Sequence, residues 1–295
     1  MRRRHTLHVR GGTLPLGEKT ALMGILNVTP DSFSDGGQFD TADRAIAHAH
    51  ELIEAGADLV DIGGESTRPG STPVSAEDEL ARILPVIEAL ADKKVLLSVD
   101  TWKSEVADRA LKAGAHLVND ITALQGDPDM AAVVKEHEAG ICLMHNPVLY
   151  RGGAAPGHFP EFGKTTRKRL DALADLDILE SLERYFDIVL DTAFNAGIEA
   201  TRIILDPGFG FGVTEAENFR LFNHLTTLLN RPFPLLVALS RKRFVQRLTP
   251  EGGSFDETTA MLGQTSAFFG VHMLRVHDVA TQAKFVRVAD EVMAG

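Results

Sequence analysis

The stretch DLVDIGGESTRPGSTPVSAEDELARILPVIEALADKKVLLSV (58–99) has the pattern of one strand–helix–strand unit. The runs at its two ends, DLVDI (58–62) and VLLSV (95–99), are too short for an ordinary helix. They are almost continuously apolar, as strands covered on both faces are. A helix is predicted over 75–91, where Ser75 is a suitable cap and the acidic residues that follow it suit the helix dipole. Such a unit is typical of a parallel α/β sheet.

The same alternation continues on both sides of this unit. The other predicted strands are ALMGIL (21–26), HLV (116–118), ICLM (141–144), RIIL (202–205), PLLVAL (234–239) and HMLRV (272–276). The clearest further helix is predicted over 177–196 and ends at Gly197. Eight strand–helix units in about 270 residues favour a (β/α)8 TIM barrel. A doubly wound open sheet is the alternative, because alternation alone does not show closure.

The chain is interpreted as one domain over residues 1–295, with the barrel proper at 21–293. The opening segment 5–17 is expected to form a hairpin that closes the bottom of the barrel. An insertion at 146–176 separates the fifth strand from its helix, and it is rich in glycine before it becomes basic. A loop of that length is either functional or disordered.

Composition excludes several classes of function. The 295 residues include 30 basic and 41 acidic side chains, for a net charge of −11. Such a chain is a poor candidate for binding nucleic acids or anionic membranes, so the basic run at 164–169 is interpreted as a solvated face. No apolar run approaches the ~20 residues that span a bilayer. The start of the chain lacks the pattern of a signal peptide, so a cytoplasmic protein is expected. Cys142, the single cysteine, is interpreted as core packing.

Polar residues follow almost every predicted strand, and in a barrel these ends converge on the face that carries active sites. They are Asn27, the stretch 61–68, Asp100, Asn119, His145, Asp206, Ser240 with Lys242, and Arg275 with His277. Any one of them could be polar by chance, since strand ends leave the core. His145 is interpreted as structural. The set as a whole favours a ligand that combines a donor-rich heterocycle, facing the acids and the amide, with a phosphate-like anion facing the cations.

Two glycine-rich loops frame the same face, MGILNVTPDSFSDGG (23–37) and DLVDIGGESTRPGS (58–71). Asn27, Thr67 and Arg68, together with backbone N–H groups, could surround a diphosphate. The alternative is that glycine, proline, aspartate and serine are simply turn residues. GFGFG (208–212) lacks the spacing of a dinucleotide-binding fingerprint.

From about residue 21 to 290 the chain resembles dihydropteroate synthase, the pterin-binding barrel family of folate biosynthesis. The motifs that carry the resemblance are MGILNVTPDSFSDGG (23–37), DIGGESTRPG (61–70), SVDTWKSEVA (98–107), LVNDI (117–121), ILDPGFGFG (204–212), LSRKRF (239–244) and LRVHDV (274–279). Each motif is moderate evidence by itself, and their common order makes the resemblance highly specific.

The resemblance implies a transferase in which 4-aminobenzoate displaces diphosphate from 6-hydroxymethyl-7,8-dihydropterin diphosphate and gives 7,8-dihydropteroate. Asp206 would bind the 2-amino and ring N–H edge of the pterin, with Asp100, Asn119 and Lys242 completing its recognition. Asn27 would bind Mg²⁺ together with diphosphate oxygens. The remaining implied contacts are Thr67, Arg275 and His277 to the diphosphate, and Phe33, Arg68 and Pro69 over the aminobenzoate. The expected catalytic residues are Lys242, Asp100, Arg275 and His277.

The resemblance also implies a homodimer and sensitivity to sulfonamides, which mimic aminobenzoate. Two positions depart from the family pattern: Val213 stands where lysine is common, and Ala238 where glycine is usual. They leave open the alternative of a catalytically silent pterin-binding paralogue. A pterin-dependent methyltransferase domain is a second alternative, but such a domain has no use for the predicted diphosphate site.

Overall fold

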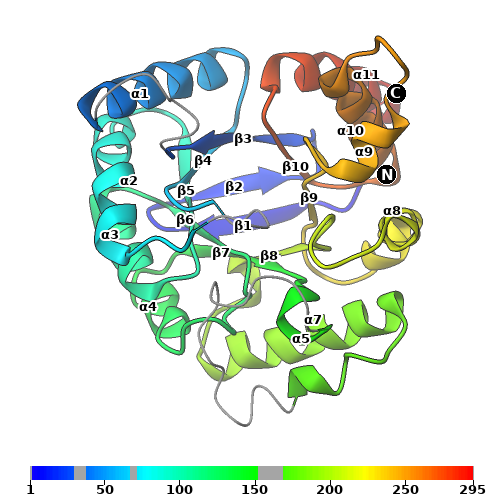
Figure 1. Cartoon of the computed structure of the whole chain (residues 1–295), viewed down its shortest axis with the longest axis horizontal. Coiled ribbons are helices and arrows are strands. Elements are labelled where there is room, and N and C mark those ends of the chain that lie inside the picture. Colours follow the sequence, from blue (N-terminus) through cyan, green and yellow to red (C-terminus); the bar gives the residue numbers. More distant parts are fainter. Residues whose placement is uncertain (1, 30–37, 67–71, 152–168, 295) are drawn as a thin grey trace.

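Eight parallel strands of the described chain form a barrel (Figure 1). The structure is a computed structural model that describes residues 2–29, 38–66, 72–151 and 169–294. The strands are β3 (Ala21–Asn27), β4 (Leu59–Gly63), β5 (Leu96–Asp100), β6 (Leu117–Asp120), β7 (Gly140–Met144), β8 (Ile203–Asp206), β9 (Leu236–Val237) and β10 (Met273–Val276). They pair in the order β8-β7-β6-β5-β4-β3-β10-β9. Seven of these eight strands differ in length from the predicted runs by no more than one residue.

The prediction for the remaining strand, β9, was wrong in length. The apolar run at 234–239 predicts six residues, but the ladder with β10 spans only Leu236 and Val237. On its other side the run reaches β8 through a single bridge between Leu235 and Leu205, supported by the Leu205 N–H donating to Pro234 O. Pro234 has no N–H to donate, so the ladder cannot extend toward its start. This bridge closes the barrel, and the open-sheet alternative is excluded.

Helices connect consecutive strands and surround the barrel (Figure 1). Those along the first half of the barrel are α1 (Gln38–Glu54), α2 (Ala76–Leu90), α3 (Ser104–Ala113), α4 (Met130–Glu136) and α5 (Val148–Arg151). The others are α7 (Ile178–Asn195), α8 (Glu215–Leu228), α9 (Arg243–Leu248), α10 (Phe255–Phe269) and α11 (Val279–Ala294). The predicted helices at 75–91 and 177–196 are α2 and α7, and the Ser75 side chain accepts from the Asp78 N–H as a cap.

The predicted hairpin is present as β1 (His5–Val9) and β2 (Gly12–Leu16). Its buried side chains Leu7, Val9 and Leu16 share one apolar cluster with residues inside the barrel. The Arg10 N–H donates to His116 O, immediately before β6 begins. The hairpin therefore closes the barrel at the amino ends of its strands and leaves the opposite end for a site.

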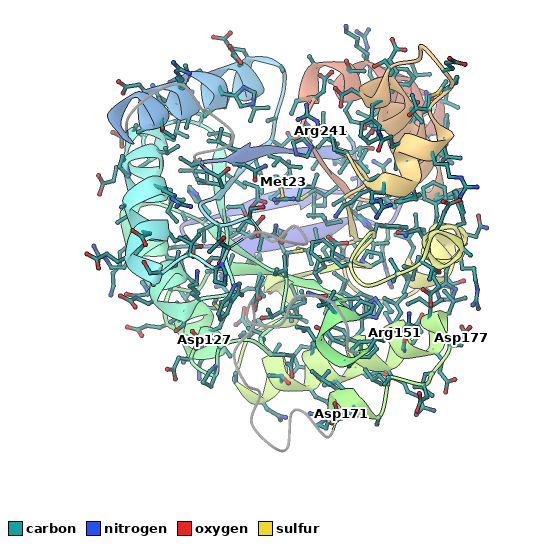
Figure 2. All side chains as sticks on the ribbon, viewed as in Figure 1. Met23, Asp127, Arg151, Asp171, Asp177 and Arg241 are labelled. Atoms are coloured by element: carbon teal, nitrogen blue, oxygen red, sulfur yellow. The ribbon has the colours of Figure 1, made fainter. Side chains whose placement is uncertain are left out.

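The barrel interior is filled by a second set of apolar side chains, distinct from the core between strands and helices. It includes Met23, which Figure 2 shows near the middle of the barrel, as well as Leu117, Ile204 and the fully buried Cys142. Burying each large apolar side chain stabilises the folded state by roughly 1.5–3 kcal/mol relative to leaving it exposed to water. The interpretation of Cys142 as core packing is confirmed.

The insertion at 146–176 is described only at its two ends, because residues 152–168 lie outside the described ones. Its first part, which includes Asn146 and Tyr150, is buried against the barrel. Arg169, the last residue of the basic run, pairs with Asp191 on an exposed surface. Within the described ranges, no helix combines the length and the apolar character needed to cross a membrane.

Candidate active site

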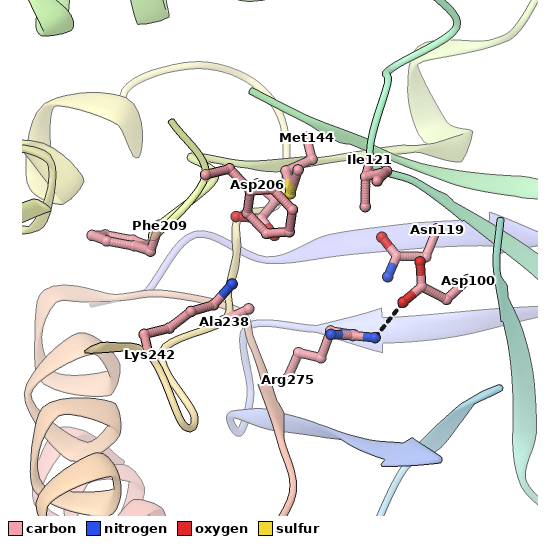
Figure 3. A pocket seen from close by; sticks show the side chains of 10 residues that line it. Asp100, Asn119, Ile121, Met144, Asp206, Phe209, Ala238, Lys242 and Arg275 are labelled. Atoms are coloured by element: carbon pink, nitrogen blue, oxygen red, sulfur yellow. Dashed lines mark hydrogen bonds and ion pairs between the residues drawn. The ribbon is translucent and has the colours of Figure 1, made fainter. Parts of the chain in front are cut away.

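A pocket lies at the carboxyl end of the barrel strands, opposite the hairpin (Figure 3). Its described lining consists of Asp100, Asn119, Ile121, Met144, Asp206, Phe209, Phe211, Ala238, Lys242 and Arg275. The lining comes from at least five strands and from the segments that follow them. This confirms the expectation that the polar strand ends converge on one face of the barrel.

Asp100 and Asn119 lie side by side because they are register partners on β5 and β6. Parallel strands place register partners on the same face, here toward the barrel axis. The Asn119 Nδ2 donates to Asp61 Oδ2 at 3.0 Å, so its amide orientation is set from within the barrel. Burial raises the pKa of Asp100 to about 7, against the opposing effect of the Arg275 guanidinium.

Arg275 is held between two carboxylates. Its Nε lies 2.6 Å from Asp61 Oδ2, and its Nη2 lies 2.6 Å from Asp100 Oδ2, the contact drawn in Figure 3. Both carboxylates raise the pKa of the guanidinium, while burial opposes them. Charge-assisted hydrogen bonds of this kind compensate part of the desolvation cost of burying the three groups. The guanidinium is therefore fixed in the pocket wall.

Asp206 ends β8 and is register partner of Met144 on β7. Its Oδ1 accepts from the Gly208 N–H at 2.8 Å. Burial raises the pKa of Asp206 to about 6, and the Gly208 hydrogen bond opposes the rise. Asp206 is a buried acceptor in a pocket that Lys242 and Arg275 also line, and no hydrogen bond to its Oδ2 is found among the described residues.

Lys242 extends over the face of Phe211, with Nζ 4.2 Å from the ring centroid. Cation–π contacts of this kind contribute about 0.5–2 kcal/mol and orient the ammonium. Arg241 precedes it with φ of 58°, a left-handed conformation that redirects the chain just before Lys242. Ala238 lines the pocket and Val213 is not part of its described lining, so of the two departures only Ala238 alters the described wall.

The other predicted site residues lie beside this pocket or outside the described chain. Asn27 is the half-buried last residue of β3, opposite Gly63. His277 follows β10, and its Nδ1 lies 2.9 Å from Ser240 Oγ. Neither belongs to the described lining. Phe33, Thr67, Arg68 and Pro69 lie outside the described residues, so the roles expected for them stay predictions.

The structure adds site residues that the sequence did not single out. Asp61 is fully buried in the middle of β4, and its bonds to Arg275 and Asn119 make it the centre of the polar wall. The signal was present, because an aspartate inside an apolar strand requires a partner. Phe209, Phe211, Ile121 and Met144 form apolar walls, and nothing in their local pattern separates them from core residues.

The described residues provide little for a metal by themselves. They contain no group of three or more histidine, cysteine, aspartate or glutamate side chains that could hold an ion. Asn27 presents one amide oxygen, a donor type that Mg²⁺ accepts. Mg²⁺ commonly keeps several waters and binds through substrate phosphates, so one protein oxygen fits a magnesium shared with a diphosphate.

The carboxyl end of the barrel thus gathers buried acids, an amide, a lysine and apolar side chains around one pocket. The family model described as pterin binding enzyme matches residues 23–277, so the class is that of the pterin-binding enzymes. A dihydropteroate synthase from Bacillus subtilis is 41% identical over 97% of this chain and 93% of its own. The Xanthomonas albilineans dihydropteroate synthase with 4-aminobenzoic acid has a TM-score of 0.84 at 38% identity, covering 99% of this chain and 100% of its own. The same enzyme in complex with 7,8-dihydropteroate has a TM-score of 0.81 at 36% identity, covering 98% and 99%. The chain belongs to the dihydropteroate synthase family.

Proposed function

We propose that this protein condenses 6-hydroxymethyl-7,8-dihydropterin diphosphate with 4-aminobenzoate, giving 7,8-dihydropteroate and diphosphate for folate biosynthesis. The observation that carries the proposal is the convergence of Asp206, Asp100, Asn119 and Lys242 on one slot at the carboxyl face of the barrel. A cytoplasmic location is part of the proposal, in keeping with a strongly acidic chain whose single cysteine is unpaired.

The pterin is recognised by its polar edges. Asp206 accepts from the 2-amino group and the neighbouring ring N–H, because an ionised carboxylate is an acceptor at both oxygens. Asp100 and Asn119 meet the remaining donors and acceptors of the ring. Lys242 donates to the carbonyl side and borders the aminobenzoate site, and Phe211 supports its ammonium. The apolar walls exclude water from the ring.

Displacement of diphosphate requires stabilisation of the negative charge that develops on the leaving group. Thr67, Arg275 and His277 are proposed to contact it, and Asn27 to bind Mg²⁺ together with its oxygens. A bound Mg²⁺ supplies a Lewis acid that neutralises charge on the diphosphate oxygens. The pterin ring delocalises positive charge left on its exocyclic methylene, so no protein nucleophile is required. Phe33, Arg68 and Pro69 are proposed to cover the aminobenzoate.

The test is diphosphate release by the purified protein with the dihydropterin diphosphate and Mg²⁺, with and without 4-aminobenzoate. We expect release that depends on 4-aminobenzoate, forms 7,8-dihydropteroate, stops with a chelator and returns on adding Mg²⁺. A sulfonamide that mimics 4-aminobenzoate should compete with it. Tight pterin binding without turnover would instead identify a catalytically silent paralogue, and release unaffected by the chelator would remove the magnesium from the mechanism.

Pterin affinity is expected to depend on pH through Asp206. The carboxyl has a pKa of about 6 in the folded protein and an ordinary value of 3.8, and recognition needs the ionised form. Affinity should therefore fall about tenfold for each pH unit below 6. The free energy of unfolding changes in the opposite direction. Asp206 binds its proton more tightly in the folded state, so its contribution to stability increases as pH falls from 6 toward 4. Calorimetric titration of a pterin from pH 5 to 8 measures the effect.

The control is Asp206→Asn, whose weaker binding should lose the fall below pH 6 and keep only the pH dependence that Asp100, with a pKa of about 7, contributes. If the native protein binds pterin equally at pH 5 and pH 8, Asp206 is not the carboxylate that recognises it.

We propose a homodimer formed through α10 and α11, which pack against each other. Exposed apolar side chains gather on these helices: Met261 and Phe268 on α10, and Val288 and Val292 on α11, with exposed fractions of 57%, 43%, 54% and 65%. Exposed apolar patches mark interaction surfaces. Light scattering should give twice the chain mass for the native protein and the single mass for Met261→Asp/Val292→Asp. The control Phe194→Ser, at an exposed apolar residue of α7, should remain dimeric, and a monomeric native protein would exclude this interface.

A further inference from the structure

The chemistry proposed above leaves a fully buried imidazole unused. His145 follows β7, and none of its surface is exposed. Its ring packs edge-on against Tyr185 of α7, with the centroids 5.1 Å apart. Both ring nitrogens have partners: Nδ1 lies 3.2 Å from Pro207 O, and Nε2 lies 2.8 Å from the Tyr150 hydroxyl oxygen. A buried histidine with two specific partners is held in one orientation.

One of these partners determines where the proton of the ring is. Pro207 O is a carbonyl and only accepts, so Nδ1 must carry the hydrogen. Nε2 then has a lone pair that faces the Tyr150 hydroxyl. That hydroxyl also donates to Ser181 Oγ at 3.2 Å, so its one hydrogen has two acceptors, and Pro207 O alone sets the tautomer. Burial lowers the pKa of His145 to about 3, so the ring is neutral at physiological pH. His145 is a fixed donor to one backbone oxygen.

That oxygen belongs to the peptide group that also contacts Asp206. In a trans peptide the C=O and the N–H point in opposite directions. In the peptide joining Pro207 and Gly208, the oxygen accepts from His145 on one side, and the Gly208 N–H donates to Asp206 Oδ1 at 2.8 Å on the other. Hydrogen bonds in such a chain polarise and strengthen one another.

The same peptide packs closely against the backbone at the end of β7. Gly208 has φ of +74°, and a Cβ at this position would lie 1.7 Å from His145 O. The His145 N–H also donates to Asp206 O at 2.8 Å. The backbone thus brings the two residues together, while the imidazole decides the tilt of the peptide plane between them.

We propose that His145 is a positioning residue for pterin recognition: its Nδ1–H orients the Pro207–Gly208 peptide, whose N–H holds Asp206 Oδ1 and directs Oδ2 toward the pterin edge, while Tyr150 contacts Nε2 on the other side of the ring. The inference rests on the proposed function, since it assigns a role at the pterin pocket. It also connects this pocket to the insertion at 146–176, because Tyr150 belongs to that segment.

The experiment compares three substitutions at one position by calorimetric titration of a pterin. His145→Asn places an amide N–H near the position of Nδ1, whereas His145→Gln places it near Nε2, and His145→Leu has no donor. We expect Leu and Gln to weaken pterin binding about tenfold or more, and Asn to restore it to within about threefold. The KM for 4-aminobenzoate should stay close to native in all variants that turn over.

Two controls separate positioning from general stabilisation. Tyr185→Phe removes the bond from the Tyr185 hydroxyl to Thr122 O in the same buried cluster without touching the Pro207–Gly208 peptide. It should lower the melting temperature and leave pterin affinity unchanged. Tyr150→Phe should weaken pterin binding by no more than about threefold, because it removes a contact at Nε2 and leaves the Nδ1 donor in place. If His145→Leu does not fold, the comparison of Asn with Gln carries the same information.

Equal pterin affinity in the Asn, Gln and Leu variants would overturn the inference, as would equal weakening in Asn and Gln. Failure of the native protein to bind pterin at all would instead overturn the proposed function, so the two outcomes are distinct.

Discussion

Asp206→Asn is expected to lower kcat/KM by about two to three orders of magnitude while leaving the melting temperature unchanged or higher. The carboxylate accepts at both oxygens, whereas an amide presents one acceptor and an NH2 group that opposes the pterin donors. Losing charge-assisted hydrogen bonds and leaving donors unpaired costs about 3–4 kcal/mol in the pocket, which gives the stated change in rate. The fold should not suffer, because burial already disfavours the charged form of Asp206.

The measurement is diphosphate release over a range of pterin concentrations, together with a thermal melt. Asp92→Asn, at an exposed acidic residue after α2, is the matched control and should behave as the native protein does. A kcat/KM for Asp206→Asn within threefold of native would show that the pterin is bound elsewhere. A large loss of melting temperature would show that Asp206 stabilises the fold, contrary to its raised pKa.

Arg275→Met is expected to lower the free energy of unfolding by about 3–5 kcal/mol near pH 7.5, besides abolishing turnover. Removing the guanidinium leaves Asp61 and Asp100 close together, with no cation between them and with Asp61 fully buried. Removing one partner of a buried ion pair lowers stability by about this amount, because the remaining charge stays buried without a counter-charge. The penalty should shrink at lower pH, where Asp100 takes up a proton: its pKa is about 7 in the native protein, and it rises further once the Arg275 guanidinium that lowers it is removed.

Urea unfolding of the native protein, Arg275→Met, and the double variant Asp61→Asn/Arg275→Met measures this coupling. The double variant should recover at least half of the lost stability, since one of the two unpaired charges is gone. Arg184→Met, which removes an exposed pair with Glu180 on α7, should change stability by no more than about 0.5 kcal/mol. If the double variant is no more stable than Arg275→Met, the unpaired charge of Asp61 beside Asp100 is not the cause of the lost stability.

Local sequence predicted the elements of this fold well because each has a strong local signal. The strand over ICLM (141–144) differs from the observed β7 by one residue at its start, and the helix over 177–196 differs from α7 by one residue at each end. Ser75 caps α2 as its position predicts. These features depend on periodicity and on backbone groups within a few residues, so neighbours in the chain suffice to determine them.

The candidate site was predictable in part for the same reason. Asp100, Asn119 and Asp206 follow apolar runs, and the topology of a barrel brings such positions to one face. Asp61 was not singled out because its importance arises from Arg275, which is 214 residues away in the chain. Phe211 was missed because its role depends on Lys242 lying over its ring, a contact that no local pattern contains.

The sequence by itself determined the order of strands and helices, the hairpin at the amino end, and the polar residue types that end the strands. Each of these is encoded within a single turn, strand or helix. Only the tertiary structure decided the closure of the barrel through Leu205 and Leu235, the pairing of Arg275 with Asp61, and the peptide shared by His145 and Asp206. Those contacts join residues from different strands, and their geometry depends on barrel curvature and side-chain packing, which exist only when the chain is folded.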